Sequence, residues 1–110
     1  MKTVIIGSGR GSNAEAIIQA QLSQLLGNAE VQAIFSDNVD SGIMQIARNN
    51  NIEAHYLDGG SFKSKLDDKA EEVWIDAIMK LQPDLIALAG FMRVLKPTFL
   101  RAFKGTIVNL

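Results

Sequence analysis

The residues with the clearest capacity for chemistry lie in the stretch GSGRGSN, residues 7–13, directly after an apolar run. Three glycines in five positions indicate a backbone that must come close to another group. Ser12 and Asn13 are residue types that begin helices, and the free N–H groups of a helix N-terminus bind anions. The stretch therefore predicts a cup for a single phosphate group, formed by Gly11, Ser12 and Asn13.

Other interpretations of these glycines stay open, although a P-loop is excluded because no Gly-Lys-Ser/Thr follows. Gly9, Gly11 and Ala14 satisfy the dinucleotide fingerprint G-x-G-x-x-A, and Asp37 lies near the place of a ribose-binding acid. A dinucleotide-binding oxidoreductase domain is therefore an alternative. The glycines are also compatible with a plain tight turn in which Ser12 only caps the helix.

The composition indicates one ordinary globular domain over residues 1–110, with 47% hydrophobic and 21% charged residues. A formal net charge of -1 provides no broad field for nucleic acid or an anionic membrane, so we expect neither as a partner. The absence of cysteine excludes disulfides, thiolate metal sites and a cysteine nucleophile. Because the chain enters a predicted strand almost at once, we expect no signal peptide and a cytoplasmic location.

The elements that must position these residues alternate between strand and helix. Apolar runs predict strands at residues 3–7, 30–36, 54–57, 84–89 and 106–110, and helical periodicity predicts helices near 14–26, 43–47, 66–81 and 97–103. This alternation predicts a doubly wound α/β fold with a mainly parallel sheet and helices on both faces. We expect a domain truncated after the fifth strand, with an exposed edge that invites self-association.

A second motif, LAGFMRVL at residues 88–95, follows the fourth predicted strand. Together with GRGSN, Ser-Asp-Asn at residues 36–38 and Val-Asn at residues 108–109, it resembles the phosphoribosylglycinamide formyltransferases of the folate-dependent formyltransferase family. The resemblance covers essentially the whole chain as an N-terminal portion. It implies transfer of a formyl group from 10-formyltetrahydrofolate to the amine of glycinamide ribonucleotide in purine biosynthesis. Related folate-dependent formyltransferases and deformylases share the fold and remain an alternative.

The resemblance also assigns roles to residues in both motifs. It places the 5'-phosphate of the substrate on the cup of Gly11, Ser12 and Asn13, as the glycines themselves predict. The folate pterin is bordered by the backbone of the segment after the fourth strand, and Lys65 stands where the family often has an arginine beside the folate. Plain core packing of the apolar side chains, and a simple surface charge at Arg93, are the alternatives from the residues alone. The folate-facing residues are Lys65, Met92, Arg93, Val94 and Leu95.

Catalysis is assigned by the resemblance to Asn109, the asparagine of an Asn-His-Asp set. An asparagine amide can donate a hydrogen bond to the oxyanion that develops during acyl transfer. In the family the histidine and aspartate come later than position 110, so we expect the isolated chain to be inactive. Formyl transfer needs no metal and no redox cofactor, and we expect none. We assign no catalytic role to His55, the single histidine.

Overall fold

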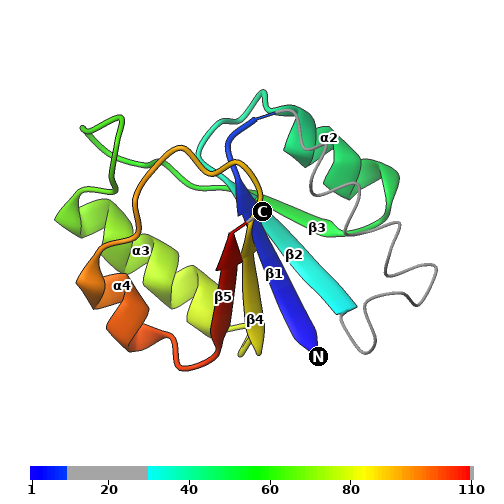
Figure 1. Ribbon diagram of the computed structural model, residues 1–110. Helices are drawn as coiled ribbons and strands as arrows, with labels where there is room; N and C mark the ends of the chain where they lie inside the picture. The colour runs from blue at the N-terminus through cyan, green and yellow to red at the C-terminus, as the bar shows by residue number, and fades with distance from the viewer. Residues whose placement is uncertain (10–29, 110) are drawn as a thin grey trace.

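The computed structural model describes residues 1–9 and 30–109. These residues form a five-stranded sheet with the order β3-β2-β1-β4-β5, in which every neighbouring pair is parallel (Figure 1). Each strand lies within one residue of its predicted place, and the predicted fold class is confirmed. The strands are β1 (Lys2–Gly7), β2 (Glu30–Ser36), β3 (Glu53–Tyr56), β4 (Leu85–Leu88) and β5 (Thr106–Asn109).

Three helices of the described residues cover the sheet from opposite sides. Helices α3 (Asp68–Met79) and α4 (Pro97–Ala102) lie together on one face, and α2 (Gly42–Asn49) lies on the other (Figure 1). The helix predicted near residues 14–26 lies outside the described residues. Within residues 1–9 and 30–109, no helix is long and apolar enough to cross a membrane.

The core has two parts because successive residues of a strand point to opposite faces of the sheet. Val4 and Ile6 of β1 pack with Trp74 of α3 on one face, whereas Ile5 packs with Ile43 of α2 on the other. All five side chains are fully buried. The near-continuous apolar runs therefore mark strands that are covered on both faces, as predicted.

Helix α3 is shorter than its apolar period predicted. Asp67 caps its N-terminus, where the carboxylate Oδ1 accepts a hydrogen bond from the backbone N–H of Ala70 at 2.8 Å. At the other end Gln82 turns the chain with a φ of 51° immediately before Pro83. The inclusion of Val73 in the buried stripe was wrong, since this side chain is 49% exposed.

The chain adds strands outward from β1 in both directions, which creates a topological switch point between β1 and β4. At such a point the loops leave in opposite directions and open a crevice at the carboxyl ends of the strands. Two hydrogen bonds close the bottom of this crevice. Ala89 N–H donates to Ile6 C=O at 2.8 Å, and Met92 N–H donates to Ser8 Oγ at 3.1 Å. The two sequence motifs therefore meet at the centre of the sheet.

Candidate active site

A cavity of about 320 Å³ lies at the carboxyl ends of β4 and β5. Its wall combines the end of β4, the loop that follows it, α4 and β5, so four consecutive segments within residues 88–109 form one hollow. The cavity contains the predicted catalytic Asn109 and four of the five predicted folate-facing residues. The lining residues are Leu88, Phe91, Met92, Arg93, Val94, Leu95, Leu100, Ile107 and Asn109.

Asn109 reaches the cavity because β5 pairs in parallel with β4, in a register that sets Asn109 opposite Leu88. Its side chain is exposed. No group within residues 1–9 and 30–109 forms a hydrogen bond with this side-chain amide, so its N–H groups are free to meet a ligand. An uncommitted amide at the mouth of a cavity has the chemistry of an oxyanion donor.

The apolar side chains of the loop after β4 divide into packed and exposed groups. Phe91 packs on Trp74, with 5.4 Å between the ring centroids, and Leu95 also contacts the core. Met92 and Val94 are 73% and 69% exposed, respectively, although both line the cavity. Core packing, the alternative for this segment, therefore describes Phe91 and Leu95 but not Met92.

The backbone of the same loop is partly committed to the protein itself. Val94 N–H donates to Ser64 C=O at 2.8 Å, and Val94 forms an isolated parallel bridge with Lys65. The N–H of Val94 is thus unavailable to a ligand. Within this loop, the backbone groups of Arg93 and Leu95 could still contact a heterocycle. The predicted backbone contact with the folate stays a prediction.

Lys65 is brought beside the predicted folate segment by this backbone bridge and not by its charge. Its ammonium lies over the ring of Phe62, 4.7 Å from the centroid, and Lys65 is not among the residues that line the cavity. Cation–π contacts of this kind are weak at exposed positions. The predicted folate contact of Lys65 therefore stays a prediction.

The structure contradicts the alternative in which Arg93 is a simple surface charge. Arg93 Nε and Asp37 Oδ2 form an ion pair at 2.7 Å, and the two side chains are only 13% and 8% exposed. Nη1 of Arg93 also donates to the backbone carbonyls of Gly59 at 2.8 Å, of Lys65 at 3.0 Å and of Phe62. Nothing in the local sequence pattern indicated these contacts, since they join three separate loops.

The ion pair bears on the dinucleotide interpretation. That interpretation needs the Asp37 carboxylate to be open to a ribose hydroxyl. One Asp37 oxygen is instead bonded to Arg93, and the other is buried with no hydrogen-bond partner in the described part of the chain. The geometry disfavours a dinucleotide at this position.

The predicted phosphate cup of Gly11, Ser12 and Asn13 lies outside the described residues. The beginning of the same stretch is described and is anchored on two sides. Ile43 N–H, in the first turn of α2, donates to Gly9 C=O at 3.1 Å, and Ser8 Oγ accepts from Met92 N–H. The glycine stretch therefore starts at the switch point, next to the cavity.

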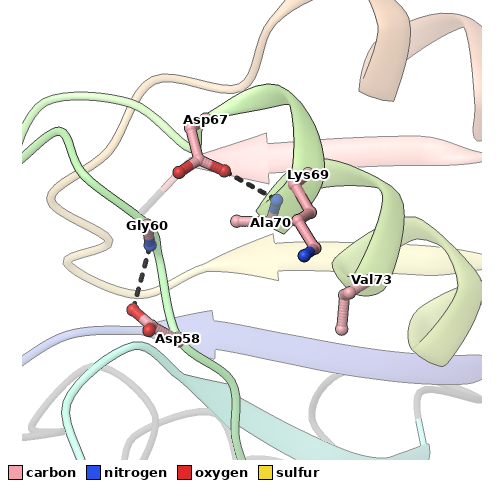
Figure 2. Close-up of a pocket in the computed structure, with 6 residues that line it drawn as sticks. All are labelled: Asp58, Gly60, Asp67, Lys69, Ala70 and Val73. Atoms are coloured by element: carbon pink, nitrogen blue, oxygen red, sulfur yellow. Dashed lines mark hydrogen bonds between the residues drawn. The ribbon is translucent and has the colours of Figure 1, made fainter.

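A second hollow of about 330 Å³ lies beside the N-terminus of α3 (Figure 2). It is lined by Asp58, Gly60, Asp67, Lys69, Ala70 and Val73. Its two carboxylates are already engaged, because Asp58 accepts from Gly60 N–H at 3.0 Å and Asp67 accepts from the N–H groups of Ala70 and Ser61. The Ala70 bond, followed by the Ser61 bond, lowers the pKa of Asp67. In the described parts of the chain, no three His, Asp or Glu side chains are grouped to hold a metal ion.

The fold and the crevice together define a Rossmann-like α/β protein whose candidate ligand site lies at the topological switch point of a parallel sheet. The chain belongs to the formyl transferase family, whose model matches residues 1–110. The phosphoribosylglycinamide formyltransferase of Escherichia coli (strain K12) is 35% identical over 110 residues, which are the whole of this chain and 50% of that protein.

Solved structures of phosphoribosylglycinamide formyltransferases are similar in fold. The structure from Brucella melitensis superimposes with a TM-score of 0.85 at 37% identity, and covers 98% of this chain and 55% of its own. The structure from Bacillus halodurans gives a TM-score of 0.87 at 33% identity, with 99% and 55% coverage. The chain thus spans about half the length of the relatives it matches.

Proposed function

We propose that this chain forms the N-terminal half of a phosphoribosylglycinamide formyltransferase site, which transfers the formyl group of 10-formyltetrahydrofolate to the amine of glycinamide ribonucleotide. One observation carries the proposal. A single cavity brings together Asn109 and the segment from Met92 to Leu95, although they lie on different strands and loops. Family membership and the similarity to named formyltransferases support the same reaction.

The residues of the cavity have complementary tasks in this reaction. Formyl transfer between two nitrogens passes through a tetrahedral intermediate, and the Asn109 amide would donate to its developing oxyanion. The exposed side chains of Met92 and Val94 would contact the flat faces of the pterin. The backbone C=O of Arg93 and the backbone N–H of Leu95 would form hydrogen bonds with the edge of the pterin. No covalent enzyme intermediate, metal or redox cofactor is needed by this chemistry.

The substrate phosphate is proposed to bind to Gly11, Ser12 and Asn13. The described neighbours support this position, because Ser8 and Gly9 start the stretch beside the cavity. Ser12→Asp would place a carboxylate in the cup and should abolish protection of the protein by phosphate monoesters. Equal protection of the parent and the Ser12→Asp variant would place the cup elsewhere.

These 110 residues by themselves are proposed not to transfer formyl groups at a useful rate. The resemblance assigns proton transfer to a histidine and an aspartate beyond position 110, and the chain spans about half of its relatives. A related folate-dependent formyltransferase or deformylase acting on another substrate is the second candidate. Self-association at the edge of β5 and a cytoplasmic location stay predictions.

The reaction can be tested by complementation. The chain is mixed with the C-terminal half of the E. coli relative, and formyl transfer to glycinamide ribonucleotide is followed by the absorbance of a 10-formyl folate. Turnover is expected only from the pair. The acceptor without its 5'-phosphate is the control, and it should react much more slowly if the phosphoribosyl group is recognised.

Ligand binding to the chain alone provides an independent check. A folate analogue should shift the amide NMR signals of Met92, Arg93 and Leu95 and leave that of Val31 unchanged, because Val31 lies at the opposite end of the sheet. An NAD titration that shifts the signal of Asp37, without any response to the folate analogue, would favour the dinucleotide alternative. Robust formyl transfer by the 110 residues alone would contradict the proposed division of catalytic groups.

A further inference from the structure

We infer that the Arg93 side chain is a positioning residue, which clamps the loop between β4 and α4 to two other loops and so sets the orientation of the cavity wall. The inference rests on the proposed function only in taking the ligand to be a folate. The clamp joins the loop after β2, through Asp37, to the loop between β3 and α3, through Gly59 and Lys65.

The contacts are made by two nitrogens of one guanidinium, Nε and Nη1. Nε donates to the Asp37 carboxylate while Nη1 faces the carbonyls of Gly59, Phe62 and Lys65. Those donors lie in one plane, at fixed angles, as the guanidinium group holds them. A lysine would keep the charge but would offer one compact ammonium in place of the planar fork.

The guanidinium of Arg93 lies close against the backbone of Gly59. Gly59 is buried, and a Cβ added at this position would collide with the guanidinium carbon and nitrogens of Arg93. The glycine thus lets this backbone approach the guanidinium closely, and a side chain at position 59 would displace Arg93 from its present place. The close contact and the hydrogen bond from Nη1 to Gly59 C=O thus describe one tight fit between this backbone and Arg93.

Stability alone gives a poor account of the ion pair. Burial of a carboxylate and a guanidinium carries a large desolvation cost, which is recovered only when the remaining polar atoms are also bonded. Asp37 Oδ1 is buried without a partner among the described residues. A pair that is only partly satisfied is better explained by the geometry it imposes than by the free energy of unfolding it contributes.

The clamp acts on the cavity through the backbone bridge next to it. Val94 N–H donates to Ser64 C=O, immediately beside the Lys65 carbonyl that Arg93 holds. On the other side, Ser8 Oγ holds Met92 N–H. The loop is thus fixed at Met92, at Arg93 and at Val94. Arg93 and Leu95, which line the cavity, therefore belong to a stretch of backbone that is held in place.

The test compares Arg93→Lys with Arg101→Lys, which makes the same chemical change at an exposed position in the last turn of α4. The first measurement is amide hydrogen exchange without ligand. Exchange at Val94 should become about tenfold faster in Arg93→Lys, because hydrogen bonds to a charged group are among the stronger ones. Exchange at Ile5 and Ile34 in the sheet should stay at the parent rate. Arg101→Lys should resemble the parent everywhere.

The second measurement is the Kd of a folate analogue, which should increase about tenfold or more in Arg93→Lys and stay unchanged in Arg101→Lys. Asp37→Asn is a milder variant that keeps the carbonyl contacts of Arg93 and removes the ion pair. It should shift both measurements in the same direction by a smaller factor. If Arg93→Lys also loses protection at Ile5 and Ile34, its fold has failed and Asp37→Asn decides the outcome.

The outcomes separate the clamp from the reaction. Val94 exchange at the parent rate in a folded Arg93→Lys variant, or unchanged affinity for the analogue, would overturn the positioning role. A parent chain that does not bind the analogue, while Arg93→Lys still accelerates exchange at Val94, would contradict the proposed function and leave the clamp in place.

Discussion

The cavity at the ends of β4 and β5 and the hollow beside α3 have nearly equal volumes, about 320 and 330 Å³, but they differ in what their polar groups already do. The carboxylates of the α3 hollow accept hydrogen bonds from neighbouring backbone N–H groups (Figure 2). The Asn109 side chain of the cavity is exposed, and no described residue bonds to it. The two regions thus differ in the hydrogen bonding of their carboxylate and amide groups and not in their volume.

The origin of the difference lies in the chain segments that form each region. The α3 hollow is built by residues 58–73, a loop and the helix it enters, and its two carboxylates accept from backbone N–H groups of that same segment. The cavity gathers residues 88–109 around the ends of two parallel strands, where adjacent loops separate. Among the polar side chains of the cavity, Arg93 is bonded to other loops, whereas the Asn109 amide has no partner among the described residues and remains available to a ligand.

The largest expected effect is at Trp74, which contacts the surroundings of both hollows. Its Nε1 donates to Asp58 C=O at 3.0 Å, and its ring packs on Phe91 of the cavity wall. Trp74→Ala should reduce the free energy of unfolding by about 3–5 kcal/mol, as expected for a large buried aromatic side chain. Urea unfolding measures the change. The exposed neighbour Val73→Ala should remain within about 0.5 kcal/mol of the parent.

The next effect should separate the two regions by activity. In the complemented pair, Asn109→Ala should lower the rate of formyl transfer by about 10² to 10³, the usual cost of losing one oxyanion donor. Asp58→Asn, in the α3 hollow, should leave the rate unchanged. A rate for Asn109→Ala equal to that of the parent would remove Asn109 from the catalytic machinery.

Two exposed valines offer a matched comparison of ligand binding. Val94→Glu would put a charge against the apolar face of the bound heterocycle, and the Kd of a folate analogue should increase at least about tenfold. Val73→Glu makes the same change in the α3 hollow and should leave the Kd unaltered. Titration calorimetry measures both, and equal effects from the two variants would mean that the analogue does not occupy the cavity.

The smallest expected effect concerns the pH dependence of stability at the α3 hollow. The pKa of Asp67 is lowered from 3.8, first by the hydrogen bond from Ala70 N–H and then by that from Ser61 N–H. The unfolded chain therefore binds more protons, so the contribution of Asp67 is fully present above the ordinary pKa and is lost as the pH falls through the lowered value.

Asp67→Asn removes this contribution while keeping a side chain that caps helices. Its Tm should lie slightly below that of the parent near neutral pH, and the two Tm values should converge as the pH falls below 3.8. Thermal unfolding followed by circular dichroism between pH 2 and 7 measures the convergence. A difference in Tm that grows toward low pH would contradict the assigned sign.

The elements that local pattern controls were predictable from the sequence. Apolar runs such as the one in β1 placed the strands within one residue, because a strand buried on both faces needs apolar side chains in succession. The motif of residues 88–95 and Asn109 were identified from residue identities, and the parallel sheet then brought them to one cavity. Local pattern also produced a wrong prediction at Val73, because helical periodicity extended the apolar stripe of α3 onto an exposed position.

The sequence by itself determined the order of strands and helices, the family and the candidate residues, since these follow from short-range patterns and residue types. Only the tertiary structure decided what Arg93 does, because its partner Asp37 lies 56 positions away and its other acceptors are backbone carbonyls, which every residue carries. It also decided that Val94 N–H is committed to Ser64. Such contacts depend on how loops from different strands pack together at the end of a sheet. The periodicity of the sequence does not predict that packing.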